Sequence, residues 1–187
     1  MIYESIDEIF AGIDESRSRL LTCAENLRAD EAGARAGDDG WTVSEILEHV
    51  SIIEDQLTKL IGVMLSKAEA AGEPAPAGLR IKPVSIEHLV ERSRHEKYQA
   101  LENTRPRGGV IIADSITRMR RTREALRALR PRLEATDLTG VRYPHPAFGP
   151  LNLYQWLIFI GAHEQRHLRQ IETVLMQSSS AHQVGEL

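Results

Sequence analysis

Four long segments of the chain repeat their apolar residues at three- and four-residue steps, the spacing of one face of an α-helix. They cover about residues 6–27, 42–70, 110–133 and 151–177. Sustained alternation with a period of two, which would indicate strands, is almost absent. The predicted fold class is therefore all-α, a four-helix bundle with long connections between helices 2 and 3 and between helices 3 and 4.

Helix boundaries are marked by capping and breaking residues. Thr42 and Glu45 have the spacing of a capping box at the start of the second helix. Three prolines in residues 72–83 end that helix. Pro131 should disturb the third helix near its end, and residues 137–150 are predicted to be a turn-rich connection.

The segment between the second and third helices is harder to assign. Residues 84–101 could form a helix that carries His88 and His95, although its apolar face is thin. Residues 1–177 are predicted to be a single helical domain, and residues 178–187 a flexible C-terminal tail.

Length and charge narrow the classes of protein. A chain of 187 residues with 42% apolar content can bury one sizeable core. Its net charge of -4 argues against a surface devoted to nucleic acid or anionic membrane. Cys23 is the only cysteine, which excludes an internal disulfide and a thiolate zinc cluster. Without a secretory leader pattern or a long apolar run, we expect a soluble, cytoplasmic protein that is not membrane-bound.

Two histidines in the last helix are the strongest indication of chemistry. His163 and His167 lie four residues apart, so both imidazoles share one helical face. His49 lies on the apolar face of the second helix. Three neutral imidazoles from two neighbouring helices can hold one divalent ion at about 2.0–2.1 Å and leave a coordination position open. We therefore predict a metal site made of His49, His163 and His167.

Two glutamates are candidates for acid or base catalysis at this site. Glu164 could act as a general base, but it points about 100° away from His163 on the helix, which favours a solvated or salt-bridged side chain. Glu45 lies one turn before His49 and could orient that imidazole or serve as an acid or base. A purely capping role for Glu45 is an equal alternative.

Three further side chains are candidates for contact with a cofactor or substrate. Arg123 lies on the apolar stripe of the third helix, where it could clamp a carboxylate or pair with a buried glutamate. Gln170 lies on the inward stripe of the last helix and could support the metal site. His145, in a proline-flanked turn, could reach the mouth of the site, although a loop histidine is usually just exposed.

Rival interpretations of the same motifs are weaker. The string from residue 163 to 167 matches the H-E-x-x-H pattern of zinc proteases, but no third ligand follows at the required spacing. A di-iron site would need a second E-x-x-H element, and none is properly placed. The seven arginines in residues 118–132 are typical of a solvated helix face.

Several of these motifs together resemble the DinB-like superfamily of damage-inducible, metal-dependent proteins. They are Trp-Thr-Val-Ser-Glu-Ile-Leu-Glu-His at 41–49, His-Pro-Ala-Phe-Gly at 145–149, Asn-Leu-Tyr-Gln-Trp at 152–156 and His-Glu-Gln-Arg-His-Leu-Arg-Gln at 163–170. The resemblance implies a four-helix bundle, frequently a homodimer, in which His49, His163 and His167 match the ligands of a zinc, nickel or similar ion. Members with known chemistry include thiol-dependent S-transferases and isomerases, which implies a low-molecular-weight thiol as a further cofactor.

Two hypotheses about function follow. In the first, the chain is an enzyme in which the ion lowers the pKa of a water or thiol for thiol transfer or for hydrolysis of a small molecule. In the second, the chain is a metal-binding or stress-response protein without turnover, and the ion ties two helices together.

Overall fold

The chain is an elongated helical bundle with a small β-hairpin on one side. The computed structural model describes residues 2–37, 40–71, 86 and 100–184, with residues 180–184 described as backbone alone. The elements are α1 (Ile6–Glu25), η1 (Glu31–Gly33), α2 (Val43–Ala70), η2 (Glu102–Thr104), α4 (Ile112–Ala128), α5 (Arg130–Ala135), β1 (Arg142–His145), β2 (Gly149–Asn152) and α6 (Leu153–Val184). Most of the expected helix that would carry His88 and His95 lies outside the described residues.

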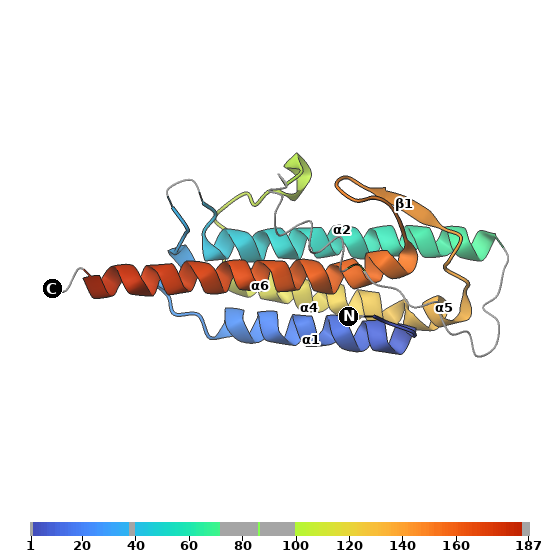
Figure 1. Ribbon diagram of the computed structural model, residues 1–187, viewed down its shortest axis with the longest axis horizontal. Helices are drawn as coiled ribbons and strands as arrows, with labels where there is room; N and C mark the ends of the chain where they lie inside the picture. The colour runs from blue at the N-terminus through green and yellow to red at the C-terminus, as the bar shows by residue number, and fades with distance from the viewer. Residues whose placement is uncertain (1, 38–39, 72–85, 87–99, 185–187) are drawn as a thin grey trace.

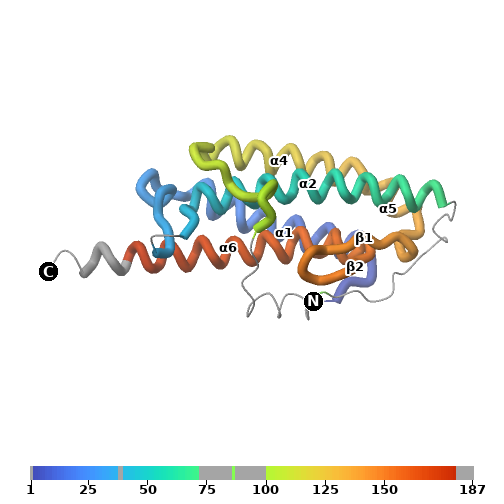
Figure 2. The backbone as a smooth tube through the Cα atoms, turned by 90° about the horizontal axis from the view of Figure 1, so that it is seen from above, coloured from blue at the N-terminus to red at the C-terminus, as the bar shows by residue number. Residues whose placement is uncertain are grey.

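Four long helices build the bundle, as the apolar periodicity predicts. Helix α6 packs against α1 and α2, and α2 also packs against α4. The hairpin leads directly into α6, and the η2 segment lies on the same side of the bundle as α2, away from α1 (Figure 1). Seen from above, α4 and the hairpin lie at opposite sides of the bundle (Figure 2). No helix among the described residues combines the length and apolar character that crossing a membrane requires.

The helices begin where side chains can satisfy their free backbone N–H groups. The predicted capping box of α2 is confirmed, because Thr42 and Glu45 each accept a hydrogen bond from the other's backbone N–H. Helix α6 begins in the same way, with Asn152 accepting from the N–H of Gln155 and Gln155 accepting from that of Asn152. These caps set the axial position of the two helices that carry the predicted metal ligands.

The third predicted helix is broken as expected. It divides at Leu129 into α4 and the short α5, and Pro131 lies in the first turn of α5. Proline is tolerated there because the N–H it lacks would have no partner inside the helix.

Two expectations are corrected. Residues 142–145 and 149–152 pair as antiparallel strands, with Tyr143 opposite Leu151, although residues up to 150 were predicted to be a turn-rich connection and residues 151–152 the start of the last helix. The last helix, expected to end near residue 177 before a flexible tail, runs to Val184. The reason is visible in the sequence, where no glycine or proline follows Gly161 until Gly185.

The buried core consists of two apolar clusters with a polar layer between them. One cluster contains the start of α1, the second half of α2 and the start of α6, and the other contains the end of α1, the start of α2 and the middle of α6. Each long helix contributes buried polar side chains to the layer, namely Ser16, Arg17, Ser51, Glu54, Thr122, Arg123, Glu164 and His167. The predicted metal ligands lie at the edge of this layer.

Candidate metal centre

The three predicted histidines converge. His49 comes from α2, and His163 and His167 come from α6. One ring nitrogen of each lies within 4.8 Å of the others, and in the described part of the chain no Asp, Glu or Cys joins them. The Nε2 atoms of His163 and His167 are 3.2 Å apart. Two imidazole ligands of one tetrahedral ion at 2.0–2.1 Å would lie about 3.3 Å apart, so the spacing fits a bound metal.

Hydrogen bonds fix two of the rings in the orientation that a metal needs. Nδ1 of His49 donates to the carbonyl oxygen of Thr104 at 2.7 Å. Nδ1 of His167 donates to Oε1 of Gln170 at 2.9 Å. Because each Nδ1 carries the proton, each Nε2 presents a lone pair to the shared centre. Nδ1 of His163 is buried and has no hydrogen-bond partner among the described residues.

Burial keeps the three imidazoles neutral, as ligands must be. It lowers the pKa of His49, lowers that of His167 to about 3 and lowers that of His163 well below its usual range. The neighbouring rings and Arg166 lower the pKa of His163 further, because they disfavour a second positive charge. At neutral pH the cluster therefore offers uncharged nitrogens to a cation.

The loop that contains Thr104, the hydrogen-bond partner of His49, is held by the carboxylate of Glu48 on α2. Glu48 is buried and accepts hydrogen bonds from the backbone N–H groups of Arg107 at 3.0 Å and Gly108 at 3.1 Å. Gly108 has a φ of 76°, a conformation that glycine adopts at little cost. These two hydrogen bonds hold the loop that follows η2, and with it the Thr104 carbonyl, against α2.

A cavity of about 1040 Å³ opens beside the cluster. The described residues that line it include all three histidines, and apolar and aromatic side chains dominate its wall. The ring of Trp41 lies 4.9 Å from that of His49. The hairpin supplies His145 and Phe148 to the lining, and α6 supplies Trp156 and Phe159. The site is thus an apolar pocket with the three nitrogens on its wall.

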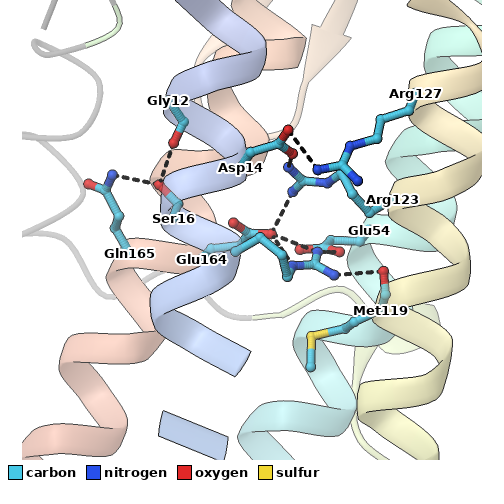
Figure 3. Close-up of polar contacts among 10 residues, drawn as sticks. Gly12, Asp14, Ser16, Glu54, Met119, Arg123, Arg127, Glu164 and Gln165 are labelled. Carbon is cyan, nitrogen blue, oxygen red and sulfur yellow. Dashed lines mark hydrogen bonds and ion pairs between the residues drawn. The ribbon is translucent and has the colours of Figure 1, made fainter. Parts of the chain in front are cut away.

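The structure places Glu164 and Arg123 elsewhere. Oε1 of Glu164 accepts hydrogen bonds from Arg17 at 2.6 and 2.8 Å and from Arg123 at 2.9 Å, inside the bundle (Figure 3). Arg123 also pairs with Asp14 at 2.8 Å. Burial raises the pKa of Glu164, and the two guanidinium groups counteract this effect. Neither side chain lines the cavity, so both have a place in the polar layer and not at the histidines.

Of the other two predicted site residues, one reaches the cluster. Gln170 lines the cavity and holds His167. Glu45 is engaged by Thr42 and does not contact His49.

Several residues that shape the site were not singled out from the sequence. Thr104 acts through its backbone, which no side-chain pattern reveals. Glu48 is separated by some sixty positions from the loop it holds; the adjacent glycines at 108 and 109 were the available signal. His145, by contrast, was singled out, with a place at the mouth of the site and plain exposure as the two alternatives; it lines the cavity, is half-buried and stacks on Phe148 at 4.4 Å.

The fold and the histidine cluster define a helical-bundle protein with a candidate three-histidine metal site beside an apolar pocket. Residues 13–171 match the family model described as the DinB superfamily. The chain belongs to this superfamily, as its sequence motifs indicated.

One curated protein and two solved structures are similar to this chain. The chain is 26% identical over 163 residues to "Uncharacterized protein YuaE" of Bacillus subtilis (strain 168), covering 86% of this chain and 93% of that protein. Its fold is similar to that of TT2238, described as a four-helix bundle protein, with a TM-score of 0.57 and 21% identity over 90% of this chain and 99% of that one. It is also similar to YfiT from Bacillus subtilis, described as a probable metal-dependent hydrolase with an unusual four-helix bundle topology, with a TM-score of 0.58 and 17% identity over 92% of this chain and 87% of that one.

Proposed function

We propose that this protein is a metal-dependent enzyme that acts on a small molecule. His49, His163 and His167 would hold one divalent ion, with zinc or nickel the expected metal. When bound, such an ion supplies Lewis acidity and brings the pKa of a coordinated water or thiol toward neutrality. Hydrolysis of a small molecule and transfer of a low-molecular-weight thiol to an electrophile are the two reactions that this chemistry would serve.

The position of the cluster on the wall of a cavity is the observation that carries the proposal. A structural ion in a protein is normally enclosed by four protein ligands, whereas a catalytic ion keeps a position for water or substrate. Here three nitrogens converge beside about 1040 Å³ of open space, and no acidic or thiol side chain of the described residues completes the set. The description of YfiT as a probable metal-dependent hydrolase supports the same proposal.

The alternative is a metal-binding protein without turnover, in which the ion ties α2 to α6. The two functions differ in whether an outside ligand can reach the metal. Purified protein would be analysed for metal content, reloaded with cobalt(II), and titrated with azide or a small thiol. The enzyme proposal predicts a change in the cobalt absorption spectrum; a spectrum that does not respond, from an ion saturated by protein atoms, would contradict it.

The histidine assignment has its own test. His163→Ala should abolish stoichiometric metal binding while circular dichroism remains helical, because the other core contacts of α6 persist. His182→Ala, on the same helix beyond the cluster, should bind metal as the natural chain does. Turnover would be sought with a panel of thiols with electrophiles and of activated esters, and it should be lost in the first variant alone. Homodimer formation also stays a prediction, which sedimentation equilibrium would test.

A further inference from the structure

His145 is a histidine that faces the same cavity from the side of the hairpin. It lies at the end of β1, is half-buried and lines the cavity. Its ring stacks on Phe148 at an interplanar angle of 16° and meets the edge of Phe159 at 4.7 Å. Phe159 in turn lies 5.7 Å from His163, so one phenylalanine ring touches both His145 and a predicted metal ligand.

The hairpin that carries His145 is fixed to the bundle. Nε1 of Trp156 donates to the carbonyl oxygen of Tyr143 at 3.2 Å, and the Trp156 ring lies 5.2 Å from the imidazole of His145. The strands pair in register, with His145 opposite Gly149. The imidazole is therefore held by packing on three aromatic rings and does not swing freely like a loop side chain.

A hydrogen bond from the backbone determines which nitrogen of His145 carries the proton. The N–H of Ala147 donates to Nδ1 at 3.1 Å, so Nδ1 must be the acceptor. In a neutral imidazole the proton then lies on Nε2, which becomes a donor. Burial lowers the pKa of His145 to about 4, so the ring is neutral at physiological pH. No described residue accepts a hydrogen bond from this Nε2.

The charge of the cavity wall limits what this donor can bind. Of the described residues that line the cavity, none carries a carboxylate, and Arg166 contributes a positive charge. A cationic ligand would lose its hydration there without finding a counter-charge among these described residues. A neutral or anionic molecule with an acceptor oxygen suits the wall, and its flat apolar part would be covered by the aromatic rings.

We propose that His145 orients the substrate, by donating its Nε2–H to a carbonyl-type oxygen of a small, flat, non-cationic acyl compound. The aromatic wall made of Phe148, Trp156 and Phe159 would hold the apolar body of that compound. This inference rests on the proposed function in taking the cavity as a substrate site. It does not require the metal, because the donor and the wall belong to the protein chain alone.

Binding of three matched probes to the metal-free, full-length protein tests the proposal. All three probes share a nitrophenyl ring: 4-nitroacetophenone has the carbonyl oxygen, 1-ethyl-4-nitrobenzene has no carbonyl oxygen, and 4-nitrobenzylamine is cationic. Trp41 and Trp156, the only two tryptophans of the chain, both line the cavity, so quenching of their fluorescence reports binding. We expect the ketone to bind about tenfold more tightly than the ethyl compound, the usual value of one hydrogen bond, and the amine to bind most weakly.

Two variants assign that preference to the Nε2 donor. His145→Phe keeps an aromatic ring on Phe148 but has no donor, so the ketone preference should disappear while the ethyl compound still binds. His145→Gln places an amide N–H near the position of Nε2 and should restore part of the preference. Tyr143→Phe is the matched control, because it removes the other side-chain hydrogen-bond donor that the hairpin contributes to the described cavity lining.

Each result decides for or against His145. A ketone preference that survives in His145→Phe, or that is lost in Tyr143→Phe, would overturn the proposal. So would ¹⁵N NMR of the imidazoles, if it found the proton of His145 on Nδ1 in the natural chain. The cobalt and azide experiment can fail without affecting these measurements, so failure of the proposed metal enzyme and failure of the His145 role are distinguishable.

Discussion

At the scale of single residues, the metal site depends on the partners of its ligands. Gln170→Ala removes the acceptor of the His167 Nδ1–H and frees the ring to turn. We expect metal affinity to fall about 10–100-fold, the usual effect of losing the group that orients a metal ligand. Competition with a chromophoric chelator would measure it.

A second glutamine on α6 provides the control. Gln165 donates to Ser16 at 2.8 Å, on the side of the helix that faces α1 (Figure 3). Gln165→Ala should leave metal affinity unchanged. Equal losses in the two variants would show that the effect comes from general loosening of α6 and not from the Gln170 contact.

Asp14 makes the stability of the bundle sensitive to acid. Burial alone would raise the pKa of Asp14, but hydrogen bonds from Arg127 and Arg123 outweigh it and bring this pKa below its usual value. The stabilisation is therefore complete above the unfolded-state value of about 3.9 and is lost as the pH falls through the lower folded-state value. Asp14→Asn should be less stable by about 1 kcal/mol at pH 7.

Denaturant unfolding of the natural chain and of Asp14→Asn from pH 7 to pH 2 tests the direction of the pKa shift of Asp14. The difference in free energy of unfolding between the natural chain and Asp14→Asn should be constant down to about pH 4 and then shrink. A difference that grows on acidification would mean that the folded state raises the pKa of Asp14.

At the scale of elements, the start of α2 contains two glutamates with different tasks. Glu45 caps the helix, whereas Glu48 holds the loop whose Thr104 carbonyl orients His49. Glu48→Gln removes the charge and one acceptor, so we expect about tenfold weaker metal binding. Glu45→Gln should bind metal normally, because glutamine also closes a capping box. The same chelator competition compares the two variants. Equal metal affinities would show that the loop held by Glu48 does not contribute to metal binding.

Local features were predictable from the sequence, whereas long-range ones were not, apart from the convergence of His49 with the two histidines of α6. The capping box of α2, the break near Pro131 and the shared face of His163 and His167 each depend on residues within one or two turns. The hairpin was missed because its strands have four residues each and contain prolines, which are normally taken as evidence against strands. The Thr104 carbonyl and the Glu48 carboxylate act across a connection whose path no periodicity specifies.

At the scale of the whole molecule, the polar layer between the two apolar clusters organises the bundle. Arg17, Glu54, Arg123 and Glu164 come from four different helices, and Arg17 bridges Glu54 and Glu164. Sequence periodicity placed Glu164 away from His163 but could not show which charges meet. One oxygen each of Glu54 and Glu164 is buried without a hydrogen-bond partner among the described residues. The layer therefore contains charges that are only partly satisfied.

Replacing the whole layer should be tolerated better than breaking it. Glu164→Gln leaves Arg17 and Arg123 buried beside an uncharged amide, and we expect a loss of about 3–5 kcal/mol in free energy of unfolding. The fourfold variant Arg17→Met, Glu54→Leu, Arg123→Met and Glu164→Leu removes every one of these charges together. Its free energy of unfolding should stay the same or rise by about 1–4 kcal/mol, because desolvating the four ions costs more than their incomplete pairing returns.

Metal binding by the fourfold variant shows whether the polar layer only pairs the helices or also positions the histidines of α6. His49 and His167 keep their hydrogen-bond partners in the fourfold variant, so it should still bind one metal ion per chain if the charges serve only to pair helices. Denaturant unfolding gives the free energy of unfolding of each preparation, and metal analysis gives its metal content. A fourfold variant as unstable as Glu164→Gln would show that the four charges are net stabilising, and a stable variant that binds no metal would show that they hold α6 in the rotation its histidines require.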